Sequence, residues 1–138
     1  MGTKTTRIHE VAPEAPRALL LIVSSTSDTQ SQQERRAEEL AALVDTMGVI
    51  VDQIEYVTLR TPNSTTLIGS GKVAEIGAII SERTVDLAIF EIPLSPRIQR
   101  NLEQIWDCAV IDRDEVILQI FADRAQTKEA VLQVELAR

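Results

Sequence analysis

The chain has 138 residues, of which 44% are hydrophobic, and this size suits one compact domain with a buried core. Its 14 Lys and Arg against 21 Asp and Glu give a net charge of −7, which disfavours extended contact with phosphate backbones. Cys108 is the single cysteine, so we exclude an intrachain disulfide and expect a reducing, cytoplasmic compartment. The apolar runs are too short to span a bilayer, and we expect no membrane partner.

Residues 1–16 mix threonines, charged residues and two prolines without a hydrophobic period, which predicts a flexible N-terminal tail. Residues 18–23 are continuously apolar, as is typical of a central strand covered on both faces. Ser31 and Glu34 then form a capping-box pattern, and apolar residues at helical spacing predict a helix that ends near Gly48.

Alternating apolar residues predict a second strand over residues 49–58, followed by a polar loop that contains a proline. A second helix is expected to start near Gly71. Residues 87–90 and 108–111 predict two short strands, and the Ser-Pro pair at 95–96 predicts a third helix between them. This alternation predicts a single α/β domain with a mostly parallel, roughly four-stranded sheet flanked by helices, over residues 17–125.

A helical period follows Asp112, and a second helical stretch runs from Thr127 to the last residue. No glycine or proline ends this pattern, which favours a larger parent protein. We therefore expect residues 126–138 to be the start of a helical extension, with self-association through residues 127–138 if its usual neighbour is missing.

Residues suited to catalysis are few. His9 is the only histidine and falls in the predicted tail, so the usual base for a serine or cysteine nucleophile is absent and an imidazole metal site is excluded. Cys108 falls on a predicted strand, where a small buried side chain is the expected interpretation. We expect no catalytic residue, no metal and no cofactor for this chain.

A glycine loop precedes the second predicted helix and consists of Gly69, Ser70, Gly71 and Lys72. Such a loop can bind an anion at the helix N-terminus. A P-loop would require glycine at position 66 and Ser or Thr at position 73, where this chain has Thr66 and Val73. The P-loop interpretation therefore fails, and an anion-binding turn and a structural or RNA-facing turn stay open.

Four basic residues fall in or beside the loops and helix starts at which an α/β sheet presents its ligand edge. They are Arg60, Lys72, Arg97 and Arg100. They are either ordinary solvated charges or a local basic edge on an acidic domain.

Three segments in order resemble the HflX family of ribosome-associated GTPases. Residues 68–76, IGSGKVAEI, resemble the family's G-x-G-K-V-x-E-[LI], and residues 94–103, LSPRIQRNLE, resemble L-S-P-x-x-Q-R-N-L-E. Between residues 110 and 137, VIDR, ILQIFADRA and LQVELA resemble V-x-D-R, L-I-L-x-I-F-A-x-R-A and L-Q-V-E-L-A. The resemblance covers roughly residues 17–138, with small departures at residues 91–93 and 129–130.

The resemblance implies an α/β N-terminal domain, a helical hairpin extension and then a GTPase domain that binds GTP and Mg and is absent from this chain. It implies association with the large ribosomal subunit and its rRNA, and splitting of stalled or idle ribosomes as part of a stress response. For this chain it implies a binding role and not an enzymatic one, with the parent's GTPase domain as a further partner. Arg60, Lys72, Arg97 and Arg100 are then the expected rRNA contacts.

Two other functions stay open. The first is a nucleotide-binding α/β protein that uses the loop over residues 69–72, and the second is a free-standing interaction module that uses the apolar helix over residues 131–137. Some residues in the matching segments also suit structural roles, since Gln99 and Asn101 can hold loops and Asp112 can cap the helix that follows it.

Overall fold

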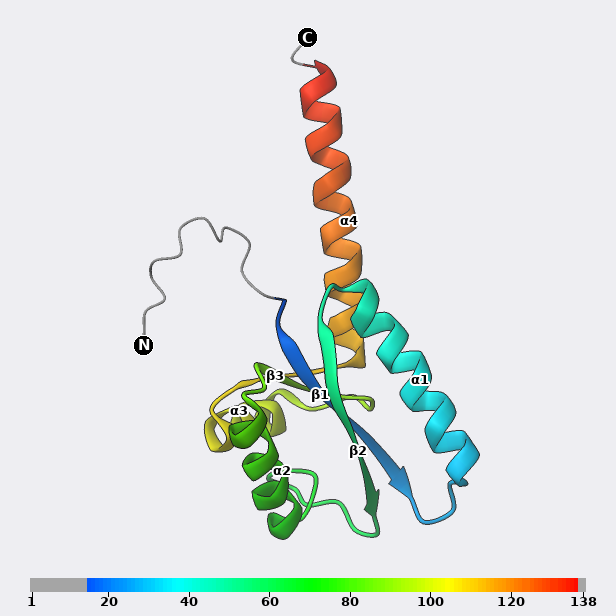
Figure 1. The fold of residues 1–138 in the computed structure, drawn as a ribbon, viewed down its shortest axis with the longest axis vertical. Helices are drawn as coiled ribbons and strands as arrows, with labels where there is room; N and C mark the ends of the chain where they lie inside the picture. The colour runs from blue at the N-terminus through cyan, green and yellow to red at the C-terminus, as the bar shows by residue number, and fades with distance from the viewer. Residues whose placement is uncertain (1–14, 137–138) are drawn as a thin grey trace.

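A computed structural model describes the backbone of residues 15–136 and the side chains of residues 15–126. Strands and helices alternate along the chain as the sequence predicts (Figure 1). The elements are β1 (Arg17–Ser25), α1 (Gln30–Thr46), β2 (Ile50–Leu59), α2 (Ser70–Arg83), β3 (Leu87–Phe90), α3 (Pro96–Trp106), β4 (Ala109–Asp112) and α4 (Arg113–Leu136). Most of the predicted tail, with His9, and the side chains of the predicted self-association segment lie outside the described residues.

The four strands form one sheet in the order β2-β1-β3-β4, and all neighbouring strands are parallel. β1 lies between β2 and β3, and residues 18–22 are fully buried. The continuous apolar run in β1 follows from this position, because both faces of the strand pack against helices. The predictions of a central first strand and a four-stranded parallel sheet are confirmed.

Alternate side chains of β1 point into two separate hydrophobic cores. Leu19 and Leu21 pack with residues of α2 and α3, whereas Leu20 and Ile22 pack with residues of α1 and α4. Figure 1 accordingly shows α2 and α3 on one side of the sheet, and α1 and the start of α4 on the other. With helices on both faces, the sheet presents its loops only at the two edges where strands begin and end.

The N-terminus of α1 differs from the sequence prediction. Thr29 is the N-cap, and its hydroxyl accepts a hydrogen bond from the backbone N–H of Gln32 at 3.1 Å. The Gln32 side chain accepts one in return from the backbone N–H of Thr29 at 2.8 Å. The predicted capping box of Ser31 and Glu34 is wrong by two residues, because the chain turns directly after β1 and Thr29 already has the extended backbone that an N-cap needs.

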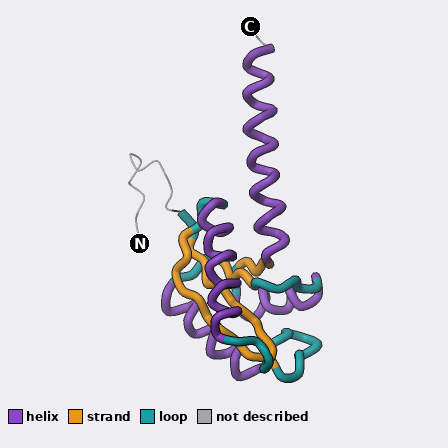
Figure 2. The backbone as a smooth tube through the Cα atoms, turned by 90° about the vertical axis from the view of Figure 1, so that its right-hand side faces the viewer, coloured by secondary structure: helices purple, strands orange, loops and turns teal. Residues whose placement is uncertain are grey.

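α4 begins directly after β4 and projects from the domain as one long helix (Figure 2). Val116 and Ile120 anchor its start in the core, while Leu118 and Phe121 are 63% and 60% exposed. The helix is continuous through residues 125 and 126, so the division between domain and extension placed there stays a prediction. Among the described helices, none combines the length and apolar character that crossing a membrane requires.

Candidate functional site

The carboxyl ends of the strands meet at one edge of the sheet. β2 lies on one side of β1, and β3 lies on the other side. The chain therefore reverses its direction across the sheet between β1 and β3. In open parallel sheets, ligands bind beyond the carboxyl ends of the strands at such a reversal. This carboxyl edge contains the N-termini of α1, α2 and α3 and the loops over residues 60–69 and 91–95.

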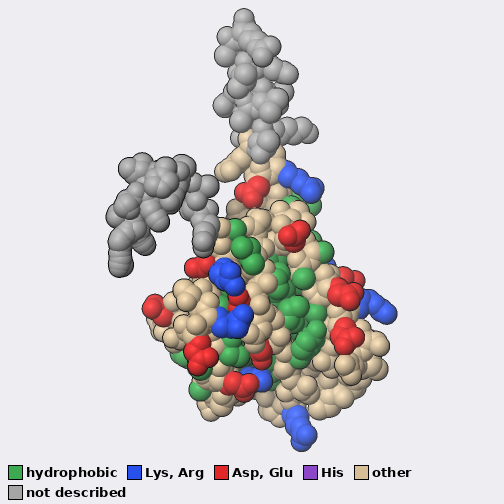
Figure 3. All heavy atoms as spheres, in the orientation of Figure 1, with side chains coloured by type: hydrophobic (Ala, Val, Ile, Leu, Met, Phe, Trp, Pro, Cys, Tyr) green, Lys and Arg blue, Asp and Glu red, His purple; other side chains and the backbone are tan. Residues whose placement is uncertain are grey.

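All four basic residues named from the sequence belong to the carboxyl edge. Arg60 directly follows β2, Lys72 lies in the first turn of α2, and Arg97 and Arg100 lie in the first two turns of α3. The three arginines are exposed, whereas Lys72 is half-buried and its Nζ lies 3.3 Å from Oε2 of Glu75. The two cavities described below are not lined by any of these four residues. On the face drawn in Figure 3, basic and acidic side chains are interspersed. The edge therefore presents three exposed arginines and one half-buried, paired lysine, and these four residues do not form a basic pocket.

The loop between β2 and α2 is held by its own hydrogen bonds. Asn63 and Leu67 exchange two backbone hydrogen bonds of 2.8 Å, and the Asn63 side chain accepts from the backbone N–H groups of Thr65 and Thr66. Leu67 has a φ of 68°, a left-handed conformation that costs a leucine on the order of 1 kcal/mol. Ile68 is fully buried and fixes the end of the loop in the core. A loop fixed in this way loses little conformational entropy when it binds a partner.

Two polar side chains of α3 connect this helix to its surroundings. The Asn101 side-chain amide donates to the carbonyl of Thr65 at 2.9 Å, so the prediction that Asn101 holds a loop is confirmed. The Gln99 amide donates to the carbonyl of Val110 at 2.6 Å and therefore holds β4, where the sequence predicted a loop. The Asn101 bond fixes α3, with its two arginines, relative to the loop over residues 60–68, and the Gln99 bond fixes it relative to β4.

The glycine loop forms the N-terminus of α2. Gly69 is the N-cap and contributes no side-chain hydrogen bond, so the N–H groups of the first turn are not capped by it. A Cβ added at Gly69 or Gly71 would meet nothing within 4 Å, which means that packing within the described chain does not require glycine at either position. The positive end of the α2 dipole and Lys72 both favour an anion here, and anion binding at this loop stays a prediction.

Sequence reasoning missed a charged cluster at the reversal between β1 and β3. The Arg36 guanidinium donates to the hydroxyl of Ser24, which is 3% exposed. It also lies 3.5 Å from a carboxylate oxygen of Glu91 and 3.6 Å from one of Asp28. The pair with Glu91 joins α1 to the loop after β3. Because two carboxylates already neutralise the guanidinium group of Arg36, the cluster is a poor binding site for an anion.

Asp112, at the end of β4, holds two elements. One carboxylate oxygen accepts from the backbone N–H of Glu115 at 3.1 Å, which confirms the predicted cap at the start of α4. The other accepts from the backbone N–H of Leu94 at 2.9 Å and so fixes the loop that leads into α3. Asp112 is therefore structural.

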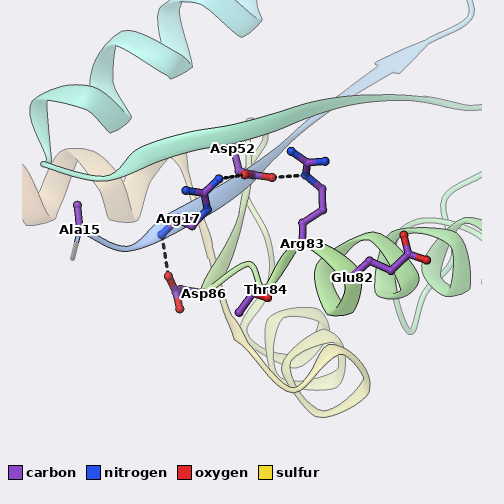
Figure 4. A pocket seen from close by; sticks show the side chains of 7 residues that line it. All are labelled: Ala15, Arg17, Asp52, Glu82, Arg83, Thr84 and Asp86. Carbon is purple, nitrogen blue, oxygen red and sulfur yellow. Dashed lines mark hydrogen bonds and ion pairs between the residues drawn. The ribbon is translucent and has the colours of Figure 1, made fainter. Parts of the chain in front are cut away.

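A cavity of 510 Å³ lies at the opposite, amino edge of the sheet (Figure 4). The register of β1 with β2 shifts between Ala18 and Leu19, and this bulge leaves Asp52 as the extra residue of β2. Its side chain is 1% exposed and pairs with the guanidinium groups of Arg17 and Arg83. The bulge thereby joins β1, β2 and the end of α2 through one carboxylate.

The electrostatics of this cavity indicate a structural role. Hydrogen bonds from Arg83 and then Arg17 lower the pKa of Asp52, and they outweigh the opposing effect of desolvation. Glu82 and Asp86 also line the cavity, so three carboxylates face two guanidinium groups. An anionic ligand would be repelled there, and we assign the cavity no ligand.

Cys108 differs from the prediction of a small buried side chain on a strand. It lies directly before β4, because strand pairing begins only at Ala109, and it is half-buried against the core. Burial is the main cause that raises the pKa of its thiol to about 11, so the thiolate is scarce at neutral pH. Within the described residues, no three His, Cys, Asp or Glu side chains form a group that could hold a metal ion.

The architecture defines the class of this protein as a doubly wound α/β domain whose polar loops and helix N-termini gather at one edge of a parallel sheet. Residues 34–122 match the family described as GTP-binding GTPase N-terminal. The chain belongs to this family, as its resemblance to HflX indicates.

Curated relatives named GTPase HflX give the same result. The protein of Treponema denticola is 49% identical over 106 residues, which cover 77% of this chain and 27% of the relative. The Escherichia coli K12 protein is 38% identical over 110 residues, or 80% of this chain and 26% of the relative. This chain thus spans only about a quarter of these relatives.

Among solved structures, the complex of SsGBP with GDP matches with a TM-score of 0.62 and 29% sequence identity. The match covers 89% of this chain and 34% of that structure. A GTP-binding protein from Sulfolobus solfataricus, also with GDP, has a TM-score of 0.58 and 22% identity, which supports the fold alone.

Proposed function

We propose that this chain is the recognition domain of an HflX-type GTP-binding protein and that it binds the large ribosomal subunit through rRNA. The contacts would be made by Arg60, Lys72, Arg97 and Arg100 at the carboxyl edge. The observation that carries the proposal is that these four cations come from three separate segments, the loop after β2 and the starts of α2 and α3, which all lie at one edge. Phosphate contacts from exposed arginines and lysines supply most of the sequence-independent affinity for nucleic acids.

Two features of the edge support an RNA partner despite the net charge of −7. The exposed N-termini of α2 and α3 add positive dipole ends next to the cations. The open space at Gly69 and Gly71 would let a phosphate backbone approach the N–H groups of α2 closely.

In this proposal the chain itself has a binding role and is not an enzyme. GTP hydrolysis, with GTP and Mg, and the splitting of stalled or idle ribosomes in a stress response would depend on a GTPase domain in the parent protein. That domain would also be a partner of this chain. A ribosomal partner would require a cytoplasmic location.

The proposal is tested by replacing Arg60, Lys72, Arg97 and Arg100 together with Ala and sedimenting the chain with purified large ribosomal subunits at low salt. We expect the replacement to weaken binding by about tenfold or more, because each lost phosphate contact weakens binding regardless of sequence. Small subunits serve as the control for non-specific binding. If the variant bound large subunits like the wild type, the carboxyl edge would not be the interface.

A second function is favoured by one observation, the 63% and 60% exposure of Leu118 and Phe121 on α4. An exposed apolar helix face suits an interaction module that pairs with another protein or with a second copy. Self-association through this face requires a dimer in sedimentation that is abolished by replacing Leu118 and Phe121 with Ser, and self-association through the end of α4 requires a dimer that is abolished by deleting residues 127–138. The nucleotide-binding alternative at residues 69–72 requires instead that a nucleotide raises the Tm of the domain.

A further inference from the structure

A cavity of 370 Å³ lies between the first turns of α1 and the strand β2. Gln30, Gln33 and Glu34 line it from α1, and Tyr56 lines it from β2. Tyr56 pairs in register with Ile22, whose side chain belongs to the core under α1, so the tyrosine ring lies on the α1 side of the sheet. The cavity thus has one aromatic wall and one polar wall.

Tyr56 is the only tyrosine of the chain and is 43% exposed. Phe90 and Trp106, by contrast, are buried and stack on each other with ring centroids 6.1 Å apart. β2 lies at the edge of the sheet, and hydrophobic side chains run along the middle of the face drawn in Figure 3. The ring of Tyr56 is therefore available to a partner and contributes little to either core.

The polar wall presents acceptors. Gln30 donates its side-chain amide to Glu34 Oε2 at 3.1 Å, and Gln33 donates its amide to the carbonyl of Asp28 at 3.4 Å. Within the described residues, no donor reaches the Oε1 atoms of these two glutamines. Amide and carboxylate oxygens accept hydrogen bonds from the exocyclic amino groups of adenine, cytosine and guanine, which uracil lacks.

We propose that this cavity binds one unstacked nucleobase of RNA, with its ring on Tyr56 and its exocyclic amino group on the oxygens of Gln30, Gln33 or Glu34. Aromatic side chains stack on any base, and hydrogen bonds at the base edge select among bases. The site would therefore prefer a base that carries an amino group over uracil.

The cavity is placed to act together with the carboxyl edge. Arg60 follows Tyr56 by four residues, which corresponds to about 13 Å along an extended chain. A strand of RNA could therefore place a base on Tyr56 and a nearby phosphate on Arg60. The inference rests on the proposed function, because it takes the partner to be RNA.

The test is fluorescence anisotropy with labelled oligoadenylate, oligocytidylate and oligouridylate of equal length. We expect Tyr56→Ala to weaken binding of oligoadenylate and oligocytidylate about five- to a hundredfold, because this is the effect of losing one base stack. Tyr56→Phe keeps the aromatic face and should bind like the wild type. Ile105→Ala, which removes another exposed apolar side chain from α3, is the matched control and should have no effect. The wild type should bind oligouridylate more weakly than the other two.

The outcomes separate this inference from the proposed function. If the wild type bound these RNAs and Tyr56→Ala bound them equally well, the base site would be wrong and the basic edge would stand. If the wild type bound no RNA, both the base site and the proposed RNA-binding function would be contradicted. Adenosine monophosphate serves as the probe for a free nucleotide, and if it bound as tightly as oligoadenylate, the cavity would be a mononucleotide site and the assignment to RNA would be overturned.

Discussion

Asp52 illustrates how one side chain can join distant segments. Asp52 is the extra residue of a bulge in β2, and its carboxylate pairs with Arg17 and Arg83. Both guanidinium groups lower the pKa of Asp52. A carboxyl group whose pKa is lower in the folded than in the unfolded state stabilises the fold above its unfolded pKa. That stabilisation is lost as the pH falls through the folded pKa.

We therefore predict that Asp52→Asn lowers the Tm at neutral pH, because the two arginines lose their charged partner. The difference in Tm between wild type and variant should be constant above the ordinary pKa of 3.8 and should shrink as the pH falls below that value. Thermal unfolding followed by circular dichroism across this pH range measures it. A difference in Tm that did not change with pH would contradict the assigned role of Asp52.

A residue's role could be predicted from the sequence only where its partner lies close to it along the chain. Asp112 caps the helix that directly follows it, and this was predictable because capping is local. The partners of Asp52 are 35 and 31 residues away, and Arg36 of α1 pairs with Glu91 in the loop after β3. Only the fold brings such residues together, so no spacing in the sequence could reveal these two clusters.

For the helices and strands, hydrophobic periodicity predicted which elements form, whereas the sequence signals for helix N-termini were less reliable. The Ser-Pro start of α3 was predictable because Ser95 accepts from the backbone N–H of Ile98 and Pro96 needs no partner for its nitrogen. The start of α1 was not, because Thr29 with Gln32 and Ser31 with Glu34 are both capping-box sequences. The tight turn after β1 decides between them.

This choice can be tested by mutation. Thr29→Ala should lower the free energy of unfolding by about 1 kcal/mol, because the backbone N–H of Gln32 loses its partner. Ser31→Ala, the matched control in the first turn, should change it by less than about 0.5 kcal/mol. Urea unfolding measures both, and equal effects of the two substitutions would contradict the observed cap.

At the scale of the whole molecule, the sequence predicted the α/β fold and the edge at which the four cations lie. It could not predict the cavity beside Tyr56, because this cavity forms only where α1 lies next to the edge strand β2. We propose that this acidic domain binds rRNA through a few cations at one edge of the sheet. Such binding must weaken with salt, since each phosphate contact releases counterions.

The most direct measurement is the affinity of the chain for large ribosomal subunits across a salt series, with and without GTP. We predict a linear fall of log affinity with log salt that GTP does not change. Arg97→Ala with Arg100→Ala should reduce the steepness of this line by about two, one for each lost phosphate contact. Gln104→Glu with Gln126→Glu changes the net charge equally, away from the carboxyl edge, and should leave the slope unchanged. Absence of binding at low salt would contradict rRNA binding by this domain, and equal slopes for both double variants would contradict phosphate contacts by Arg97 and Arg100.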